Sequence, residues 1–394
     1  MRHLSDDERR ARIARRHAIA PGRRAADPVA ATRAMTVLHA TEPATVYLSL
    51  HARVDGLGVA DVDAALYEQR SLVKQLAMRR TLFVFPRDLL PAAWGSASAR
   101  VAAALRARLA KEVAMAGIAE DGAAWLDTAC AAVKARLDGG VELGAQAIRE
   151  SVPEVDARMD LAAGTAYGAN VAIAPRVLTQ LGVEGDIVRG RNGGHWRTSR
   201  PQWTAMESWL GEPLPEPWTP RAGYAELVGR WLRTFGPGTA ADLQWWLGGT
   251  KGAVGTALED VGAVEVALEG GGTGWVLADD LDAVDPVEPW AALLPVLDPT
   301  VMGWKERDFY LGPHTDLLFD RNGNAGTTAW WDGRIVGCWV QDPDGVVVLS
   351  LLEDVGAEAV AALRVEADRL TAWLGGVRVS TVYPSMGMKQ ALAP

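Results

Sequence analysis

Two polar side chains flank one apolar residue at His39-Ala40-Thr41, within the segment VLHATEP of residues 37–43. Residues i and i+2 of a strand point the same way, so His39 and Thr41 would face one site while Ala40 points into the core. Neutral imidazole, with an unperturbed pKa of about 6.5, can serve as a general base, and a threonine hydroxyl can orient a water molecule. A histidine beside a threonine is also a common structural pair, and the residues alone leave both alternatives open.

Two helices are predicted ahead of this segment. Ser5 with Glu8 forms a capping-box pattern that opens a helix through about Arg16. Asp27-Pro28 supplies the N-cap and the first-turn proline of a second helix. The second helix runs into VLHATEP, so the polar pair is expected where a helix leads into a strand.

A β-rich run follows at residues 72–85, LVKQLAMRRTLFVF, and Pro86 is its stop signal. The run is expected to fold back at Met78-Arg79-Arg80, which puts two arginines at the tip of a hairpin. Such a pair can contact a nucleic-acid phosphate, and it is equally compatible with a solvated turn. Helices that lead to a two-stranded hairpin are the layout of a winged helix, and residues 1–94 are predicted to form the first one.

Residues 95–212 are predicted to repeat this order of helices and hairpin, with little sequence similarity to the first unit. Helical stretches at 143–151 and 172–181 lead to the hairpin DIVRGRNGGHWRTSRPQW, in which Asn192-Gly193 predicts a tight turn. The hairpin carries four arginines, which are Arg189, Arg191, Arg197 and Arg200. It is therefore the best candidate for a wing that contacts DNA, and a basic but merely solvated hairpin is the alternative.

A proline-rich linker at 213–220, PLPEPWTP, opens a third unit, predicted over residues 213–289. Its helices lead to the hairpin VEVALEGGGTGWVL, which carries Glu265 and Glu269 and no basic residue. This wing should repel phosphate, so the third unit is expected to be structural or to contact something other than the DNA backbone.

From residue 290 the pattern changes to strands. The turns Asp332-Gly333 and Asp344-Gly345 predict consecutive hairpins, and residues 356–374 predict an amphipathic helix. The predicted fold class is α+β, with three tandem winged-helix domains at 1–94, 95–212 and 213–289 and a C-terminal antiparallel β-barrel at 290–394.

Several of these segments resemble the AlkZ/YcaQ-like DNA glycosylases. VLHATEP resembles the active-site strand of that family, in which Gln-x-Gln or Gln-x-Asp precedes Glu-Pro, and MRRTLFVF resembles its hairpin MRGTLHLV. YLSLHARV, with Tyr47 and Arg53, resembles YLGLWAR, while LLPVLDPTVMGWKERDFYL and TTAWWDGRIVGCW resemble segments of its C-terminal barrel. The resemblance extends to about residue 385 and implies the same order of three winged helices and a barrel.

The resemblance implies cleavage of the N-glycosidic bond of alkylated purines in DNA, including bulky adducts and interstrand crosslinks. Alkylation at N7 or N3 makes the base a positively charged leaving group, so the remaining demand is a water placed at C1′ of the sugar. His39 and Thr41 would hold that water, with Glu42 as an accessory group. A protonated His39 would oppose the positive charge that develops on the sugar, so activity is expected to fall as the pH drops through the pKa of the histidine.

Double-stranded DNA, alkylated at a purine, is the partner that the resemblance implies, and a monomer is expected. The residues expected to contact DNA are Arg53, Arg79 and Arg80 together with the arginines of the second hairpin. Because both glutamines of the family motif are replaced, a catalytically inactive winged-helix protein, serving as a transcription regulator or lesion sensor, is the alternative. A third possibility is that the winged helices mediate protein contacts, which fits the acidic net charge.

Composition limits the remaining function classes. The 394 residues carry a formal net charge of −9, although the first 33 residues are rich in arginine and could form a positive face. Cys130 and Cys338 lie among apolar residues and are expected to be buried reduced thiols. No metal-ligand spacing, cofactor motif or membrane-spanning run is present in the sequence, and a cytoplasmic, nucleoid-associated protein without a cofactor is expected.

Overall fold

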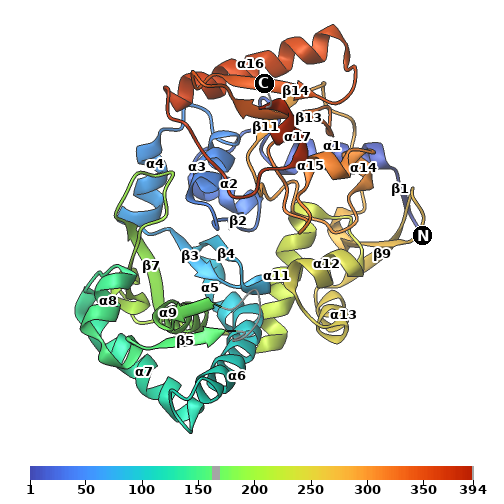
Figure 1. The fold of residues 1–394 in the computed structure, drawn as a ribbon. Helices are drawn as coiled ribbons and strands as arrows, with labels where there is room; N and C mark the ends of the chain where they lie inside the picture. Colours follow the sequence, from blue (N-terminus) through green and yellow to red (C-terminus); the bar gives the residue numbers. More distant parts are fainter. Residues whose placement is uncertain (162–168, 393–394) are drawn as a thin grey trace.

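The computed structural model describes residues 1–161 and 169–392 (Figure 1). In the first segment, Ser5 accepts a hydrogen bond from the amide of Glu8 and Asp27 accepts one from the amide of Ala30, so both predicted N-caps are confirmed. The main elements of this segment are α1 (Asp6–Arg16), α2 (Pro28–Ala34), β2 (Leu38–His39), α3 (Pro43–His51), α4 (Val59–Asp63), β3 (Leu72–Leu76), β4 (Leu82–Pro86) and α5 (Leu90–Ala93).

The predicted hairpin is formed by β3 and β4, and β2 adds a third strand to it. The strand order is β2-β4-β3, with Leu38 opposite Val84 and His39 opposite Phe83. Helix α9 (Ala174–Glu184) and strand β7 (Ile187–Asn192) of the second segment pack against β3, and α12 (Ala240–Leu247) of the third packs against the turn between β3 and β4. The hairpin therefore lies where three parts of the chain meet, as Figure 1 shows.

The second segment has a hydrophobic cluster of its own, which includes Leu126, Val177 and Trp203. Its main elements are α6 (Ala99–Met115), α7 (Gly122–Leu137), α8 (Ala145–Ser151), β5 (Arg158–Leu161), β6 (Ala169–Ala172), α9 (Ala174–Glu184), β7 (Ile187–Asn192), β8 (Pro201–Ala205) and α10 (Met206–Leu210). The β5–β6 hairpin was not predicted. The basic hairpin is confirmed as β7 and β8, but the tight turn at Asn192-Gly193 is wrong, because a longer loop, 193–200, joins the strands.

The third segment consists of α11 (Pro220–Phe235), α12 (Ala240–Leu247), α13 (Lys251–Asp260), β9 (Ala263–Leu268) and β10 (Thr273–Leu277). Thr239 and Asp242 form a reciprocal capping box at the start of α12. The N-terminal strand β1 (His3–Leu4) pairs in parallel with the end of β9, opposite Ala267 and Leu268, so the start of the chain adds an edge strand to the acidic hairpin next to its turn.

An open sheet takes the place of the predicted C-terminal barrel. The last segment contains β11 (Ala291–Leu294), α14 (Asp308–Leu311), α15 (Thr315–Leu318), β12 (Thr328–Trp331), β13 (Arg334–Gln341), β14 (Val347–Leu351), α16 (Gly356–Leu374) and α17 (Met386–Ala391). Within the described residues the strand order is β11-β12-β13-β14, which leaves β11 and β14 as edges. Leu363, Leu370 and Leu374 of α16 pack with residues of the sheet, so a helix covers apolar surface that a closed barrel would bury inside itself.

The arginines of the N-terminal region are held in contacts within the protein. Arg12 and Arg16 both bind Asp280, Arg9 lies over the ring of Phe309, and Arg24 binds Glu366. The positive face that the sequence suggested there is therefore largely neutralised. None of the helices in the described part of the chain combines the length and apolar character that crossing a bilayer requires.

Candidate active site

His39 lies at the end of β2, buried with only 5% of its surface exposed. Its ring packs on Phe83 with the ring centroids 4.7 Å apart, and its Nδ1 is buried without a hydrogen-bond partner among the described residues. Burial, and then the positive charge of Arg79, lower the pKa of His39 to about 3. The imidazole is therefore neutral at physiological pH, and it is a much weaker base than an exposed histidine.

Thr41 lies outside the strand. Strand β2 ends at His39, and Thr41 occupies the bend between β2 and α3 with an exposed side chain. The amide of Ala40, the residue between them, still donates to the carbonyl of Leu82 at 2.9 Å, and its side chain is buried as expected. The two candidate groups are two residues apart in sequence, but the expectation that one strand presents both is wrong.

Glu42 follows at the N-cap of α3, where its side chain makes no capping hydrogen bond. Its Oε1 instead accepts hydrogen bonds from the hydroxyl of Thr381 at 2.8 Å and from the amide of Val382 at 2.6 Å. Burial raises the pKa of Glu42 above its usual range. The carboxyl group thus ties the candidate site to the C-terminal segment, and it lines a mostly apolar cavity of about 350 Å³ that also includes Trp339.

Arg53 was predicted to contact DNA, and the structure contradicts this. Its side chain is fully buried and donates to both carboxylate oxygens of Asp298, at 2.7 and 2.8 Å, and to the hydroxyl of Thr300 at 2.8 Å. Burial alone would raise the pKa of Asp298, but the charge and hydrogen bonds of Arg53 hold it below its usual range. The guanidinium is thus a structural group that joins α3 to the loop before α14.

Arg79 and Arg80 occupy the turn between β3 and β4, but they point to different surroundings. Arg79 lies over the indole of Trp245, 4.1 Å from its ring centroid, and is half-buried, whereas Arg80 is exposed. Both have positive φ angles, 55° and 60°, a region that costs a side-chain-bearing residue on the order of 1–2 kcal/mol. The expected exposed pair is therefore one packed arginine and one accessible arginine.

The arginines of the second hairpin also differ in accessibility. Arg189 is half-buried, 5.1 Å from the ring centroid of Trp203, while Arg191 forms an ion pair with Glu142 at 3.7 Å. Arg197 and Arg200 are exposed in the loop that joins the strands.

Trp196 anchors this loop to other parts of the molecule. Its ring centroid lies 5.2 Å from that of Tyr47 and 5.5 Å from that of Trp373. The exposed arginines of the loop are thus held close to α3, the helix that follows the candidate site.

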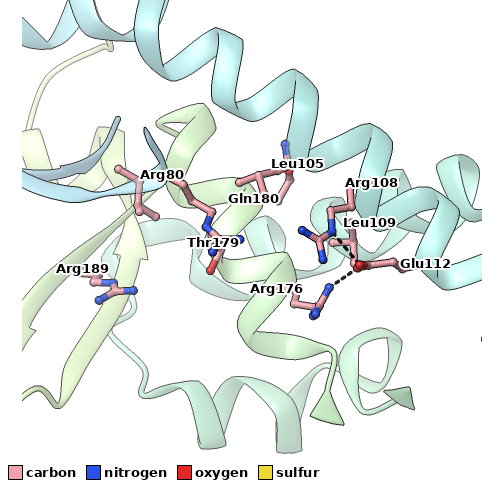
Figure 2. Close-up of a pocket in the computed structure, with 10 residues that line it drawn as sticks. Arg80, Leu105, Arg108, Leu109, Glu112, Arg176, Thr179, Gln180 and Arg189 are labelled. Carbon is pink, nitrogen blue, oxygen red and sulfur yellow. Dashed lines mark hydrogen bonds and ion pairs between the residues drawn. The ribbon is translucent and has the colours of Figure 1, made fainter. Parts of the chain in front are cut away.

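Sequence reasoning missed a cavity of about 350 Å³ between the turn at Arg80, helices α6 and α9, and strand β7 (Figure 2). We call it the arginine cavity, because Arg80, Arg108, Arg176 and Arg189 line it together with Glu112. Arg108 binds Glu112 at 2.8 Å, and Arg176 binds the same carboxylate. The i, i+4 spacing of Arg108 and Glu112 was visible in the sequence, but that spacing is also typical of a solvated helix face.

Comparison with known proteins adds independent information. The model of a family described as DNA glycosylase AlkZ-like matches residues 32–373. Among solved structures, the chain is similar to the DNA glycosylase AlkZ of Streptomyces sahachiroi, with a TM-score of 0.75 and 19% sequence identity over 96% of this chain and 99% of that one. The comparison with curated protein sequences gave no match.

Proposed function

Because the chain belongs to the AlkZ-like DNA glycosylase family, we propose that it is a monofunctional glycosylase that hydrolyses the N-glycosidic bond of alkylated purines in DNA. The observation that best supports this proposal is the match of the family model to residues 32–373, a range that includes His39 and Thr41. Both side chains can hydrogen-bond a water molecule, and neither carries a charge.

The chemistry of the lesion explains why uncharged groups suffice. An N7- or N3-alkylated purine is already cationic, so the bond to C1′ breaks with its electron pair going to the base. Positive charge then develops on the sugar, and the neutral His39 does not repel it. Thr41 would orient the water whose oxygen bonds to C1′, and the proton of that water passes to the solvent, since His39 with a pKa of about 3 is a poor proton acceptor.

The proposed partner is double-stranded DNA bound by one copy of the chain, with the three helix-and-hairpin units acting as winged helices. Arg80, Arg197 and Arg200 are exposed and are the proposed phosphate contacts. Arg79, Arg189 and Arg191 each make a contact within the protein and would bind DNA with the atoms that these contacts leave accessible. Interstrand crosslinks and bulky adducts are included in the proposed substrates.

A second candidate function is DNA binding without catalysis. It is favoured by the different surroundings of the two groups, because His39 is buried while Thr41 is exposed beyond the end of the strand. A lesion sensor or a transcription regulator needs only the DNA-binding surface. This candidate predicts tight binding of alkylated duplex with no release of the base.

The two candidates are separated by measuring abasic sites in duplexes that contain N7-methylguanine or N3-methyladenine. The glycosylase proposal predicts base release by the wild-type protein and its loss in the double variant His39→Ala, Thr41→Ala. A matched control removes the same two residue types from exposed positions elsewhere, His3→Ala with Thr128→Ala, and should retain full release. Binding without release by the wild-type protein would support the second candidate.

A further inference from the structure

The lining of the arginine cavity has an excess of positive charge. Four arginines and one glutamate contribute to it, so three positive charges are not balanced within the lining. Figure 2 shows Arg108 and Arg176 joined to Glu112 by dashed lines, with Arg80 and Arg189 toward the other side of the cavity. An opening of about 350 Å³ with this charge is suited to an anion and unsuited to a cationic or apolar ligand.

Arg189 lines this cavity, and its guanidinium lacks a negatively charged partner among the residues that the structure describes. Its guanidinium is half-buried against Trp203, and its Nε is buried without a hydrogen-bond partner among the described residues. Burial lowers the pKa of Arg189, and no carboxylate in the described part of the chain counters the effect. An anion in the cavity would supply the missing negative charge and would accept hydrogen bonds from the terminal nitrogens of the guanidinium, which unlike Nε are not buried.

Arg80 reaches the cavity from a backbone conformation that favours glycine. Its φ angle is 60°, in the left-handed region, and it follows Arg79, whose φ angle is 55°. A glycine would adopt this conformation without steric cost, yet the chain has a long cationic side chain at the rim of the cavity. The unfavourable backbone is explained if the guanidinium of Arg80 has a ligand to bind.

We propose that the arginine cavity binds one backbone phosphate of duplex DNA, with Arg80 and Arg189 as direct contacts. Glu112 holds Arg108 and Arg176 at the far side of the cavity, where they add positive charge, and its own carboxylate weakens the attraction. This inference rests on DNA being the partner in the proposed function. It adds a contact between the first hairpin and the second segment, so a duplex bound there would touch both parts of the chain at once.

Two substitutions in the full-length protein test the proposal, because they are expected to change DNA affinity in opposite directions. Arg80→Gly removes the guanidinium while giving the backbone the residue it favours, so the urea unfolding midpoint should not fall. DNA affinity should fall about fivefold to tenfold near 0.1 M salt, and the slope of log K against log salt should decrease by about one unit. Glu112→Gln removes a negative charge and keeps the shape, and it should bind duplex about threefold more tightly. A gain in binding cannot result from misfolding.

The matched control is Arg364→Ala, which removes one exposed arginine from α16, at the opposite end of the molecule from α6 in Figure 1. It should change neither the affinity nor the salt slope. A salt slope for Arg80→Gly equal to that of Arg364→Ala, or a Glu112→Gln variant that binds no more tightly than wild type, overturns the proposal. A second experiment titrates the protein with inorganic phosphate. If phosphate alone binds tightly and the DNA salt slope of Arg80→Gly is unchanged, the cavity is a site for a small anion, and the proposal of a DNA phosphate contact is overturned.

Failure of this inference is distinguishable from failure of the glycosylase proposal. Base release from N7-methylguanine duplex is measured on the same variants at saturating protein. If the binding shifts occur without base release by any form, the phosphate site stands and the enzymatic proposal fails. If wild type releases the base while the binding shifts are absent, only the phosphate site is wrong.

Discussion

His39 is the residue whose environment most changes the chemistry expected from the sequence. From sequence, a histidine near its unperturbed pKa predicted an acid limb in the activity close to pH 6.5. In the structure, burial against Phe83 and β4 lowers the pKa of His39 to about 3. The protonated form, which would oppose positive charge on the sugar, is therefore populated only well below neutral pH.

We predict that the single-turnover rate of base release is nearly constant from pH 8 to about pH 5 as far as His39 is concerned. The rate should not fall over this range because the pKa of His39 is lowered, so its ring stays neutral until the pH falls toward 3. The rate is measured over this range on N7-methylguanine duplex, with depurination of free DNA subtracted at each pH. A decline centred between pH 6 and 6.5, absent in His39→Gln, would contradict the assigned environment.

Arg53 gives a second prediction at this scale. Arg53→Met leaves the buried carboxylate of Asp298 without its cationic partner, and loss of one member of a buried ion pair costs about 3–5 kcal/mol. The free energy of unfolding in urea should fall by roughly this amount. For protein that remains folded, the salt slope of DNA binding should equal that of wild type, since Arg53 does not reach the surface. A normal unfolding free energy with a shallower salt slope would restore the original expectation of a DNA contact.

At the scale of elements, local signals in the sequence predicted much of what surrounds the site. The caps at Ser5 and Asp27 and the fold-back of β3 onto β4 are determined by residues close in sequence, and all are confirmed. The early end of β2 was not predicted. Pro43 begins α3 immediately after Glu42, so the chain must leave the strand within a few residues of His39, and Thr41 falls in the bend.

Glu42 supplies a prediction about the segment that it holds. Glu42→Ala removes the acceptor for the hydroxyl of Thr381 and the amide of Val382, so this part of the C-terminal segment should open more often. Hydrogen exchange of the Val382 amide should accelerate by about tenfold or more, whereas amides of β13 should be unaffected. Glu42→Gln keeps an acceptor oxygen at the same place and is the matched control. Equal exchange in wild type and Glu42→Ala would mean that these hydrogen bonds do not hold the segment.

At the scale of the whole molecule, long-range partners account for the incorrect expectations. The sequence shows strands after residue 290 but not that α16 covers their sheet, which is why a barrel was expected and an open sheet is found. It likewise shows an arginine-rich beginning but not that Asp280 and Glu366 neutralise it. The arginine cavity was missed for the same reason, since its charged residues come from three separate parts of the chain: the hairpin turn at Arg80, helix α6, and the consecutive elements α9 and β7.

Three buried histidines predict how the stability of the whole chain responds to acid. Burial lowers the pKa of His17, His39 and His51 to about 3 each. The unfolded chain, with ordinary histidine pKa values, binds protons first as the pH falls below about 6.5. Stability is therefore present at neutral pH and is lost on acidification, by up to about 1.4 kcal/mol per pH unit for each histidine between these values.

His51 allows this prediction to be tested at one position, because neither of its ring nitrogens has a hydrogen-bond partner among the described residues and its ring stacks on Trp373. His51→Phe keeps an aromatic ring there and removes the titrating group. The loss of unfolding free energy from pH 7 to pH 5 should become smaller by about 1–2 kcal/mol, as measured by urea denaturation at both values. His3→Phe, at an exposed position, should leave the pH dependence unchanged. If His51→Phe is as acid-sensitive as wild type, His51 is not buried in its neutral form.

His39 and Thr41 together are proposed to support hydrolysis of an alkylated purine nucleotide. The decisive measurement is single-turnover release of the base from N7-methylguanine duplex, with protein in excess and binding of the same duplex measured in parallel. We predict release by wild type and by the His3→Ala, Thr128→Ala control, and a loss of about 100-fold or more in His39→Ala, Thr41→Ala, with duplex affinity nearly unchanged. Release by the double variant at the wild-type rate, or tight binding by wild type with no release, would contradict the claim.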